Sequence, residues 1–475
     1  MPTMSSSHGR ATSAGGLRPN AGALNPRQLT SYLGNSRDLA ELLSLQQRHG
    51  DRFDGFHISA FWSKFKSFAR GELGGLSDRL VPVCEQTLRM LPELDARQMA
   101  NVAHAFAKAR LVGASPWEIV WAALPEAVCR RLGDFKVQDL SITAWAFANA
   151  GQASPELYNA ISAEVVRRWL GDFDPQDISN TAWAFAKAGH ASPELYNAIS
   201  AEVVRQRLGD FNPQHLPNTA CAFVKAGHAS PELYNAISAE VVRRRLGHFN
   251  PQDISNTAWA FATVGHASPE LYNAISAEVV RRGLGDFNPQ DISNMAWAFA
   301  VSNPASADEL FGTTSFVTRC AHFETSLSLT DTNLSQLHQW SLWRDERGAQ
   351  WPGLPNSLRQ ACSAAFVAGG EEPSQLQADV VRKIRSRVPH VEEEHRCQVS
   401  GYSIDALVTL KDGKKVAVEV DGPSHFVGCS QQPTGATLLK HRQLRYFGWH
   451  LQIVRYWEWE RGSSNVNVLH WLPNP

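Results

Sequence analysis

The chain has few cysteines, no long apolar run and almost no net charge. Its seven cysteines, among 475 residues, are scattered without a C-x-x-C pair, which argues against a zinc finger and against a disulfide framework. No apolar run approaches the roughly 18–20 residues that cross a bilayer, so no membrane span is expected. Because the formal net charge is −1, any nucleic-acid binding must come from local basic stripes.

Acidic residues are also absent from the first 37 positions. This segment holds several Ser and Gly and the four arginines Arg10, Arg18, Arg27 and Arg37. Such a composition is typical of an organelle transit peptide, which would direct the protein to the mitochondrial matrix or the plastid stroma. The alternative is a disordered tail, because the segment shows little apolar periodicity. On either interpretation, residues 1–37 are expected to precede the folded part.

A motif recurs at a constant interval in the middle of the chain. Its equivalent positions are Asp139, Asp177, His215, Asp253 and Asp291. Self-similarity at this period is typical of a solenoid, in which each unit buries its apolar face against its neighbours. Five strong copies cover about residues 136–303, and about three degenerate copies include Ile58–Phe65, Met99–Phe106 and Leu334–Trp340. We therefore predict an α-helical repeat array over residues 38–349.

Each copy reads as a helical hairpin. In the copy from Asp174 to Phe211, Asp174 and Pro175 form a helix start, and Gly189 ends the helix. A second helix begins at Ser192-Pro193, and Gly209 ends it. Apolar residues recur at helical spacing in both helices, so each has one face for the core.

A polar stripe on the first helix is the candidate binding face. We place Asp177, Asn180, Ala184 and Lys187 on this stripe. A row of Asn and Lys one repeat apart would meet successive nucleotides, with Lys on phosphate and Asn on base edges. The alternative is a solvated helix face, or Asn side chains that bridge adjacent repeats. The predicted RNA-binding positions of the array are Asn101, Lys108, Asn180, Lys187, Asn218, Lys225, Asn256 and Asn294.

Two further series recur, and each has two interpretations. Trp145, Trp183, Trp259 and Trp297 would either stack on bases or, as is more common for a repeated tryptophan, fill the core between repeats. Arginine runs close each second helix, where they would relieve the helix dipole or form a basic ridge; they are Arg130-Arg131, Arg167-Arg168, Arg243-Arg244-Arg245 and Arg281-Arg282.

The pattern changes after about residue 350. We interpret residues 350–372 as a linker, 373–462 as a small α/β domain and 463–475 as a tail. A helix at Gln375–Ile384 precedes strands at Val391–Val399, Tyr402–Leu410 and Lys415–Val420, and the expected hairpin turn between the last two is Asp412-Gly413. A helix at Thr437–Phe447 and a strand at His450–Tyr456 complete the order α-β-β-β-α-β.

This carboxy-terminal segment resembles the RAP domain. The resemblance rests on the runs YSID (402–405), VAVEVDGPSHF (416–426), TGATLLKHRQLR (434–445), Gly448-Trp449 and YWEW (456–459). The RAP family is an RNA-associated module of mitochondrial and plastid proteins, commonly preceded by helical repeats, as in FAST-kinase-domain proteins and octotricopeptide-repeat proteins. The period of the array, from Asp139 to Asp177, and the W-A-F-A core resemble the octotricopeptide class. The resemblance implies processing, stabilisation or translation control of organelle transcripts, including ribosomal RNA maturation.

RAP domains are similar in fold to PD-(D/E)xK nucleases, which raises the question of catalysis. Asp405 and Glu419 occupy the positions at which such nucleases hold Mg²⁺, whereas Asp421 occupies the usual lysine position. Lys440 on the next helix would then supply a migrated cation, and His425 would be an acid, a base or a structural histidine. Because the lysine is missing from its usual place, we favour a domain that binds without cleaving and needs no cofactor.

The sequence therefore predicts a mostly α protein, an α-solenoid followed by a small α/β RAP domain with a nuclease-like core. Its expected ligand is single-stranded organelle RNA, messenger or ribosomal, with other RNA-processing proteins or the ribosome as further partners. In the RAP domain, His425, Lys440, Arg442 and Arg445 are the predicted RNA contacts. The alternatives are a Mg²⁺-dependent endoribonuclease and a protein-interaction scaffold. Since the central repeats are nearly identical, each would read nearly the same base, so a short homopolymeric tract is the expected target.

Overall fold

The computed structural model describes residues 24–68, 75–113, 116–168, 170–190, 192–206, 208–370, 373–461, 469 and 471–472. The chain divides into two compact units, residues 1–122 and 123–475. In the first unit lie α1 (Pro26–Gly34), α2 (Leu39–His49), α3 (Gly55–Phe68), α4 (Ser77–Met90) and α5 (Ala96–Lys108), and the boundary falls within α6 (Glu118–Arg130). Helix α1 lies within residues 1–37, which were expected to precede the folded part. Its Leu29 and Leu33 are buried, so this part of the segment is folded. Residues 1–23 lie outside the described residues.

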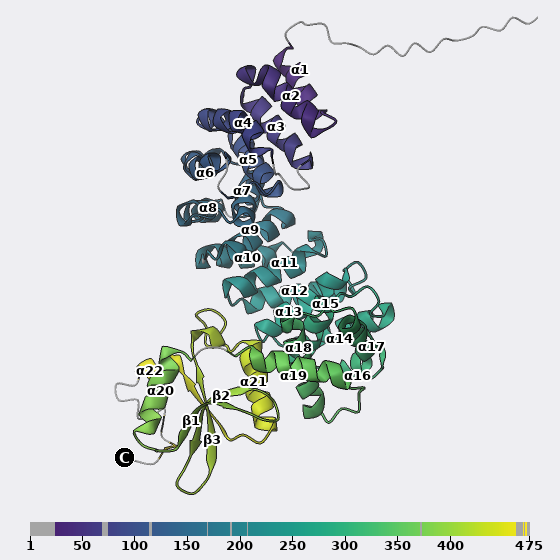
Figure 1. Cartoon of the computed structure of the whole chain (residues 1–475), viewed down its shortest axis with the longest axis vertical. Helices are drawn as coiled ribbons and strands as arrows, with labels where there is room; N and C mark the ends of the chain where they lie inside the picture. Colours follow the sequence, from purple (N-terminus) through teal and green to yellow (C-terminus); the bar gives the residue numbers. More distant parts are fainter. Residues whose placement is uncertain are drawn as a thin grey trace, which may run out of the picture. The chain divides into compact units, whose positions relative to one another are not determined.

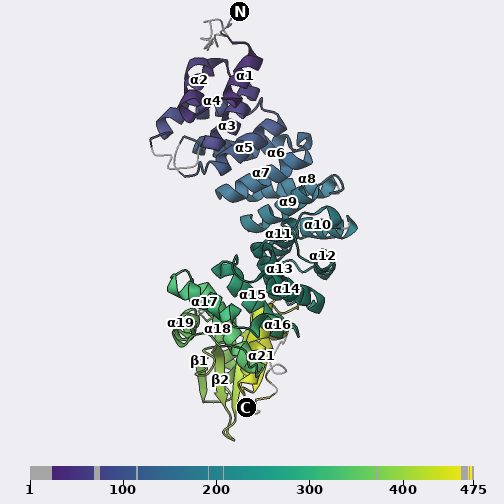
Figure 2. The same ribbon diagram turned by 90° about the vertical axis from the view of Figure 1, so that its right-hand side faces the viewer.

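The second unit contains the five strong repeats; the first four are helical hairpins as predicted, and the fifth contributes its first helix. The first helices are α7 (Val137–Ala150), α9 (Pro175–Ala188), α11 (His215–Ala226), α13 (Pro251–Thr263) and α15 (Pro289–Ser302). The second helices are α8 (Pro155–Arg167), α10 (Pro193–Arg205), α12 (Pro231–Arg243) and α14 (Pro269–Arg282), with 3₁₀ turns at Leu132–Asp134 and Leu208–Asp210. First helices pack along one row and second helices along another, and the first row is the more tightly packed (Figures 1 and 2).

Local sequence sets the limits of these helices. In α9 the Asp174 side chain accepts a hydrogen bond from the Asp177 backbone N–H, and Pro175 takes the first helical position. Gly189 follows the helix with a φ of 66°, a left-handed conformation that glycine adopts without a Cβ penalty. The predicted start and end of this helix are therefore confirmed.

Tyrosine and phenylalanine side chains join each repeat to the next. The Tyr196 hydroxyl in α10 donates to the Ala182 carbonyl oxygen in α9, over 2.8 Å, which closes its own hairpin. The same ring lies edge-on to Phe223 of α11, with centroids 5.0 Å apart. Both rings are fully buried, so one tyrosine ties three helices together.

The array continues into α16 (Ala307–Phe311), α17 (Ser315–Thr325) and α18 (Asp331–Glu346), where α18 follows α15 in the first row. The degenerate copy predicted at Leu334–Trp340 lies within α18, and those at Ile58–Phe65 and Met99–Phe106 lie within α3 and α5. The segment interpreted as a linker contains a helix, α19 (Asn356–Ala368), which packs against α18 and buries Leu358 and Cys362.

The carboxy-terminal domain is a four-stranded sheet with helices on both faces. Its elements are α20 (Gln375–Arg385), β1 (Val391–Arg396), β2 (Ser403–Thr409), β3 (Lys415–Asp421), η4 (Pro423–His425), α21 (Gly435–Tyr446), β4 (Leu451–Arg455) and α22 (Tyr456–Arg461). The strand order is β1-β2-β3-β4; only the β3–β4 pair is parallel. The predicted order α-β-β-β-α-β is confirmed, and so is the predicted fold class (Figure 1).

Alternation along β3 divides its side chains between the two faces of the sheet. Val416, Val418 and Val420 pack against α20 in the larger core. Ala417 lies in the core on the other face, beside Leu444 of α21. Glu419 and Asp421 share the parity of Ala417, so both carboxylates point toward α21. Leu469 and Leu472 also belong to the larger core, although we interpreted 463–475 as a tail.

Candidate functional site

The open face of the first helices carries one stripe of side chains per repeat. In α9 the stripe is Gln176, Asn180, Trp183 and Lys187, which follow at intervals of 4, 3 and 4 residues on one side of the helix. Gln176 and Lys187 are exposed, whereas Asn180 and Trp183 are half-buried. The equivalent stripes of α7, α11 and α13 contain no carboxylate and one lysine, Lys225. Their residues are Gln138, Ile142, Trp145 and Asn149 for α7; Gln214, Asn218, Cys221 and Lys225 for α11; and Gln252, Asn256, Trp259 and Thr263 for α13.

The predicted stripe therefore has to be corrected at two positions. Asp177 and Ala184 are both buried, at 7% and 0% exposure. Asp177 faces the preceding repeat, where its carboxylate accepts a hydrogen bond of 2.6 Å from the Ser141 hydroxyl. Burial raises the pKa of Asp177, and the hydrogen bond from Ser141 opposes that rise. The exposed glutamines of the stripe were not among the predicted site residues, although their recurrence once per repeat could have identified them. They are Gln138, Gln176, Gln214 and Gln252.

The predicted Asn and Lys positions differ in how open they are. Asn180, Asn218 and Asn256 are half-buried on the stripe, and Lys187 and Lys225 are exposed. The Lys187 ammonium group lies 4.8 Å from the centroid of the Trp183 ring and 2.6 Å from Asn149 Oδ1 of the preceding repeat. Asn294 is different: it is buried in α15 and accepts a hydrogen bond from Gln336 of α18. Asn294 is therefore closed to a ligand in this arrangement.

The tryptophans divide in the same way. Trp145, Trp183 and Trp259 are half-buried on the stripe, whereas Trp297 is buried with 7% exposure. Helix α15 packs against both α18 and α21, which closes its face. Only Trp297 has the burial expected of a core residue, so the tryptophan positions of α7, α9 and α13 keep an open part. The carboxy-terminal domain reaches the ends of α11 and α13, where Gln432 donates to the Val264 carbonyl oxygen over 2.6 Å.

In the first unit, the equivalent positions on α5 are Asn101, His104 and Lys108. Asn101 donates to the Ser59 hydroxyl over 3.1 Å, so it bridges adjacent helices. Lys66 Nζ lies 3.2 Å from His104 Nδ1. Burial, together with the nearby Lys66 and Lys108, lowers the pKa of His104 to about 4. Burial and the nearby Lys108 likewise lower the pKa of Lys66, which marks a cluster of positive charge.

The arginine runs are bound within the array and do not form a free ridge. The Arg244 guanidinium group donates to the carbonyl oxygens of Leu208 and Phe211 in the preceding repeat, at 2.6 and 2.5 Å. Its neighbour Arg243 is exposed and pairs with Glu240. Arg168 and Arg282 make the equivalent contacts with backbone carbonyl oxygens of the repeats that precede them. Arg168, Arg244 and Arg282 therefore have a structural role.

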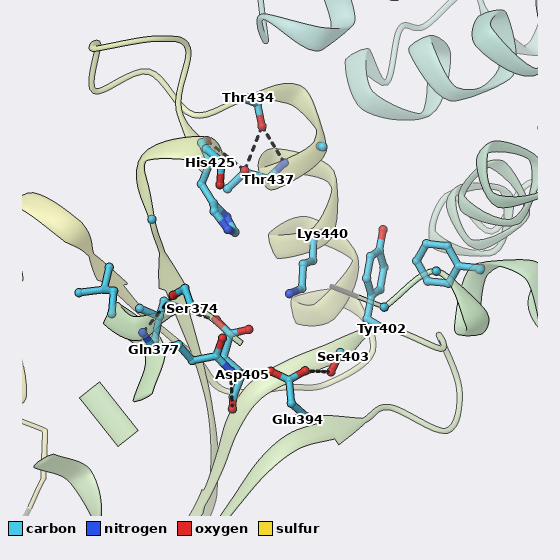
Figure 3. A pocket seen from close by; sticks show the side chains of 18 of the residues that line it. Ser374, Gln377, Glu394, Tyr402, Ser403, Asp405, His425, Thr434, Thr437 and Lys440 are labelled. Atoms are coloured by element: carbon cyan, nitrogen blue, oxygen red, sulfur yellow. Dashed lines mark hydrogen bonds between the residues drawn. The ribbon is translucent and has the colours of Figure 1, made fainter. Parts of the chain in front are cut away.

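A pocket of about 480 Å³ lies between α21, β2 and the end of α19. Its polar lining includes Gln377, Glu394, Asp405, His425, Thr437 and Lys440. Figure 3 shows Lys440 reaching into this pocket from α21, with Asp405 and Glu394 below it and His425 on the opposite rim. Glu394 accepts hydrogen bonds from Ser403 and Gln377. Glu394 was not among the predicted site residues, because its Glu-rich strand reads as a charged edge strand.

Lys440 joins the two carboxylates that the sequence placed in a nuclease-like site. Its ammonium nitrogen lies 2.5 Å from Glu419 Oε2, and Glu419 is fully buried. Burial raises the pKa of Glu419 to about 8, against the opposing effect of Lys440. Burial alone would lower the pKa of Lys440, but Glu419 and Asp405 outweigh it and raise the pKa. Asp405 accepts a hydrogen bond from the Val420 backbone N–H over 2.6 Å, and burial raises its pKa.

Asp421, in the position of the usual nuclease lysine, contacts two histidines. Asp421 Oδ1 lies 3.2 Å from His425 Nδ1 and 3.3 Å from His441 Nε2. Burial favours a raised pKa for Asp421, but the two histidines outweigh it and hold the pKa well below the ordinary value. Asp421 therefore orients these two rings on the face of the sheet that packs against α21. Within the described residues, no group of three or more His, Cys, Asp or Glu side chains is placed to hold a metal ion.

Two predicted phosphate contacts on α21 have different surroundings. Arg442 donates to Glu346 of α18 over 2.6 Å and to the Val301 carbonyl oxygen over 2.8 Å. Its guanidinium group is thereby committed to holding the domain against the repeats. Arg445 is exposed and remains available for a phosphate contact.

Among the described residues, no helix has the length and apolar character to cross a membrane.

Comparison with known proteins finds matches in both parts of the second unit. The RAP domain profile matches residues 418–467. The profile of the RNA-editing substrate-binding complex 6 protein matches residues 159–328, from α8 to the residues after α17. A protein of Oryza sativa subsp. japonica named "RAP domain-containing protein, chloroplastic" is 32% identical over 99 residues. That match covers 21% of this chain and 15% of the rice protein. The chain thus carries a RAP domain at its carboxy-terminal end, preceded by helical repeats that match the profile of the RNA-editing substrate-binding complex 6 protein.

Proposed function

We propose that this protein binds single-stranded RNA along the open face of its first helices. The observation that carries the proposal is the stripe that recurs once per repeat over α7, α9, α11 and α13. It presents amides, indole rings and two lysines, and it contains no carboxylate. This set of groups suits an unpaired polyanion, since lysine attracts phosphate, amides contact base edges and aromatic rings stack on bases.

The two similarities support an organelle role for this binding. One similar protein is named as chloroplastic, and one similar family is named for substrate binding in RNA editing. We propose that the protein acts in a mitochondrion or plastid on messenger or ribosomal RNA, in processing, stability, ribosomal RNA maturation or translation control. The octotricopeptide class remains our prediction for the repeats. Imaging the full chain with a carboxy-terminal fluorescent tag tests the compartment, and a purely cytosolic signal would contradict it.

Salt dependence tests the binding directly. Neutralising phosphates releases counterions, so the affinity for a single strand falls as the salt concentration rises. We expect purified protein to bind a labelled unstructured RNA more tightly than the corresponding duplex, with an affinity that decreases steadily as KCl is raised. Affinity that is indifferent to KCl would contradict the proposal. Tight binding of a peptide with no RNA binding would favour the protein-interaction scaffold instead.

A second candidate is the Mg²⁺-dependent endoribonuclease, favoured by one observation. The structure brings Lys440 beside Glu419 and Asp405, as a migrated nuclease lysine would require. One observation opposes it: Glu419, a carboxylate that would bind the metal, is fully buried. Incubation of RNA with and without Mg²⁺ separates the candidates. Cleavage that requires Mg²⁺ and disappears in Asp405→Asn would establish the nuclease.

A further inference from the structure

We propose that the half-buried tryptophans on the first helices stack on RNA bases, and that Cys221 leaves a gap in the series. The series is Trp145, Trp183, Cys221 and Trp259, one residue on each of α7, α9, α11 and α13. This inference rests on the proposed RNA binding and specifies how the bases are held. It concerns the base rings, whereas the salt dependence concerns the phosphates.

The burial of the tryptophans separates this role from a core role. A tryptophan that only fills the core is covered, as are Trp297 at the same repeat position and Trp340 in α18. Trp145, Trp183 and Trp259 instead lie on the open stripe with part of each side chain exposed. The buried part fixes each ring in place, so little conformational freedom would be lost when a base stacks on the exposed part.

The neighbours of Trp183 fit this use. The Lys187 ammonium group lies over the Trp183 ring, 4.8 Å from its centre, so a cation and an aromatic ring share one place on the stripe. A base that stacks on this face of the ring would displace the ammonium group, which would then be free to pair with a phosphate. A nucleotide offers the matching pair, a base for the ring and a phosphate for the lysine. Lys225 takes the same position in α11, where the ring partner is replaced by Cys221.

The series has a defined end. Asn294 and Trp297 on α15 are buried, and α15 packs against α18 and α21. The open series in the second unit therefore contains four positions, three with an indole ring and one with a thiol. Burial also raises the pKa of the Cys221 thiol to about 12, so this side chain stays neutral and offers neither charge nor ring. A base that reaches α11 would meet Asn218 and Lys225 without a stacking partner.

The chain offers its own design for a test, because the same slot holds tryptophan in α9 and α13. Cys221→Trp completes the series, and Cys221→Ala removes the thiol without adding a ring. Stacking of one base on an aromatic ring is worth roughly 1–3 kcal/mol, which corresponds to about 5- to 150-fold in affinity. We expect Cys221→Trp to bind a short labelled oligouridine or oligoadenylate more tightly by a factor in this range. Cys221→Ala should bind like the wild type.

A second pair of variants covers the case in which Cys221→Trp disturbs the fold. Trp183→Phe keeps a ring, and Trp183→Leu keeps an apolar side chain without one. We expect Phe to retain most of the affinity and Leu to lose about 5- to 150-fold, with similar thermal unfolding for the two. A 2-aminopurine base in the oligonucleotide adds a direct readout, because its fluorescence is quenched when it stacks.

The outcomes distinguish the two proposals. If the wild type binds RNA in a salt-dependent way, but Trp183→Leu and Trp183→Phe bind equally well and 2-aminopurine is not quenched, the stacking inference is overturned and RNA binding stands. If folded Cys221→Trp then binds RNA no more tightly than Cys221→Ala, the idea that Cys221 interrupts a series of stacking positions is also overturned. If the wild type binds no RNA at any KCl concentration, the proposed function itself fails.

Discussion

Arg244 donates a hydrogen bond of 2.5 Å to the carbonyl oxygen of Phe211, which lies one repeat earlier. A second bond of 2.6 Å reaches Leu208. The equivalent residue of the preceding repeat is Gln206, which makes a single bond of 3.1 Å to Phe173. The same junction is thus closed in two ways within one chain.

This natural difference gives a reciprocal prediction about stability. Arg244→Gln should lower the free energy of unfolding by about 1.5–3 kcal/mol, because charged hydrogen bonds to backbone oxygens are lost. Gln206→Arg should raise it, provided that the new guanidinium group reaches the same carbonyl oxygens. Thermal and urea unfolding measure both changes. RNA affinity serves as the control: a large loss of affinity in folded Arg244→Gln would show that the arginines contact phosphate after all.

Acid should destabilise the array through a second repeated pair. Glu164 has its pKa lowered to about 2 by the hydrogen bond from Arg167, with a further contribution from Arg168, against the opposing effect of burial. The ordinary value is 4.5, so the stabilisation is complete above pH 4.5 and is lost as pH falls toward 2. The pKa values of Glu202, Glu240 and Glu278 are lowered in the same way.

The Glu164→Gln variant checks this assignment. Its deficit in unfolding free energy, relative to the wild type, should be largest near neutral pH and should shrink as pH falls from 4.5 toward 2. Urea unfolding at a series of pH values measures it. A deficit that does not change over this range would contradict the assignment.

The stripe lysines should set the salt dependence of RNA binding. For a single strand the slope of log affinity against log salt is about −0.7 per neutralised phosphate. Lys187→Gln and Lys225→Gln should each make the slope less steep by roughly this amount, and the double variant by about twice as much. Lys411→Gln, at the exposed turn between β2 and β3, is the matched control. Equal slopes in all of these variants would place the RNA on another surface.

Lys440 should matter for stability whether or not the domain cleaves RNA. Above the pKa of about 8 that burial gives Glu419, its carboxylate is ionised and forms an ion pair with Lys440. Removing one partner of a buried ion pair commonly costs about 3–5 kcal/mol, because the other charge stays buried. We expect Lys440→Met to destabilise the RAP domain on this scale, and Glu419→Gln added to Lys440→Met to restore part of the loss. A double-mutant cycle measured by thermal unfolding gives the coupling. Additive effects of the two substitutions would show that the pair is not coupled.

Much of the fold could be predicted from the sequence, because its signals are local and repeated. Asp174, Pro175 and Gly189 mark the ends of α9 by capping and by backbone conformation, and the structure places the helix between them. The resemblance of the run EVDGPSHF to the RAP family located the carboxy-terminal domain. The expected linker was wrong in part: α19 has an apolar face that contacts α18, and its weak periodicity did not predict that packing.

The candidate site was predicted less well, because exposure depends on neighbouring repeats. Asp177 looked like a surface residue, but the Ser141 hydroxyl of the preceding repeat covers it. Arg442 looked available for phosphate, but Glu346 lies 96 positions earlier and binds it. Asn294 matches Asn180 in sequence, and only the packing of α18 and α21 on α15 makes it buried. Such long-range contacts leave no periodic signal in the sequence.

The junction made by Arg244 and its equivalents also bears on how the protein can change in length. Because these junctions use the same backbone carbonyl groups, a duplicated or deleted repeat unit would meet its neighbours through contacts that already exist. The closed face of α15 would remain where it is, since α18 and α21 hold it independently of the copy number. If the stripe binds RNA, each added or deleted repeat would lengthen or shorten the bound stretch of RNA by the length that one repeat contacts. The change would fall on the amino-terminal side of α15, and the end of the bound stretch at α15 would stay the same.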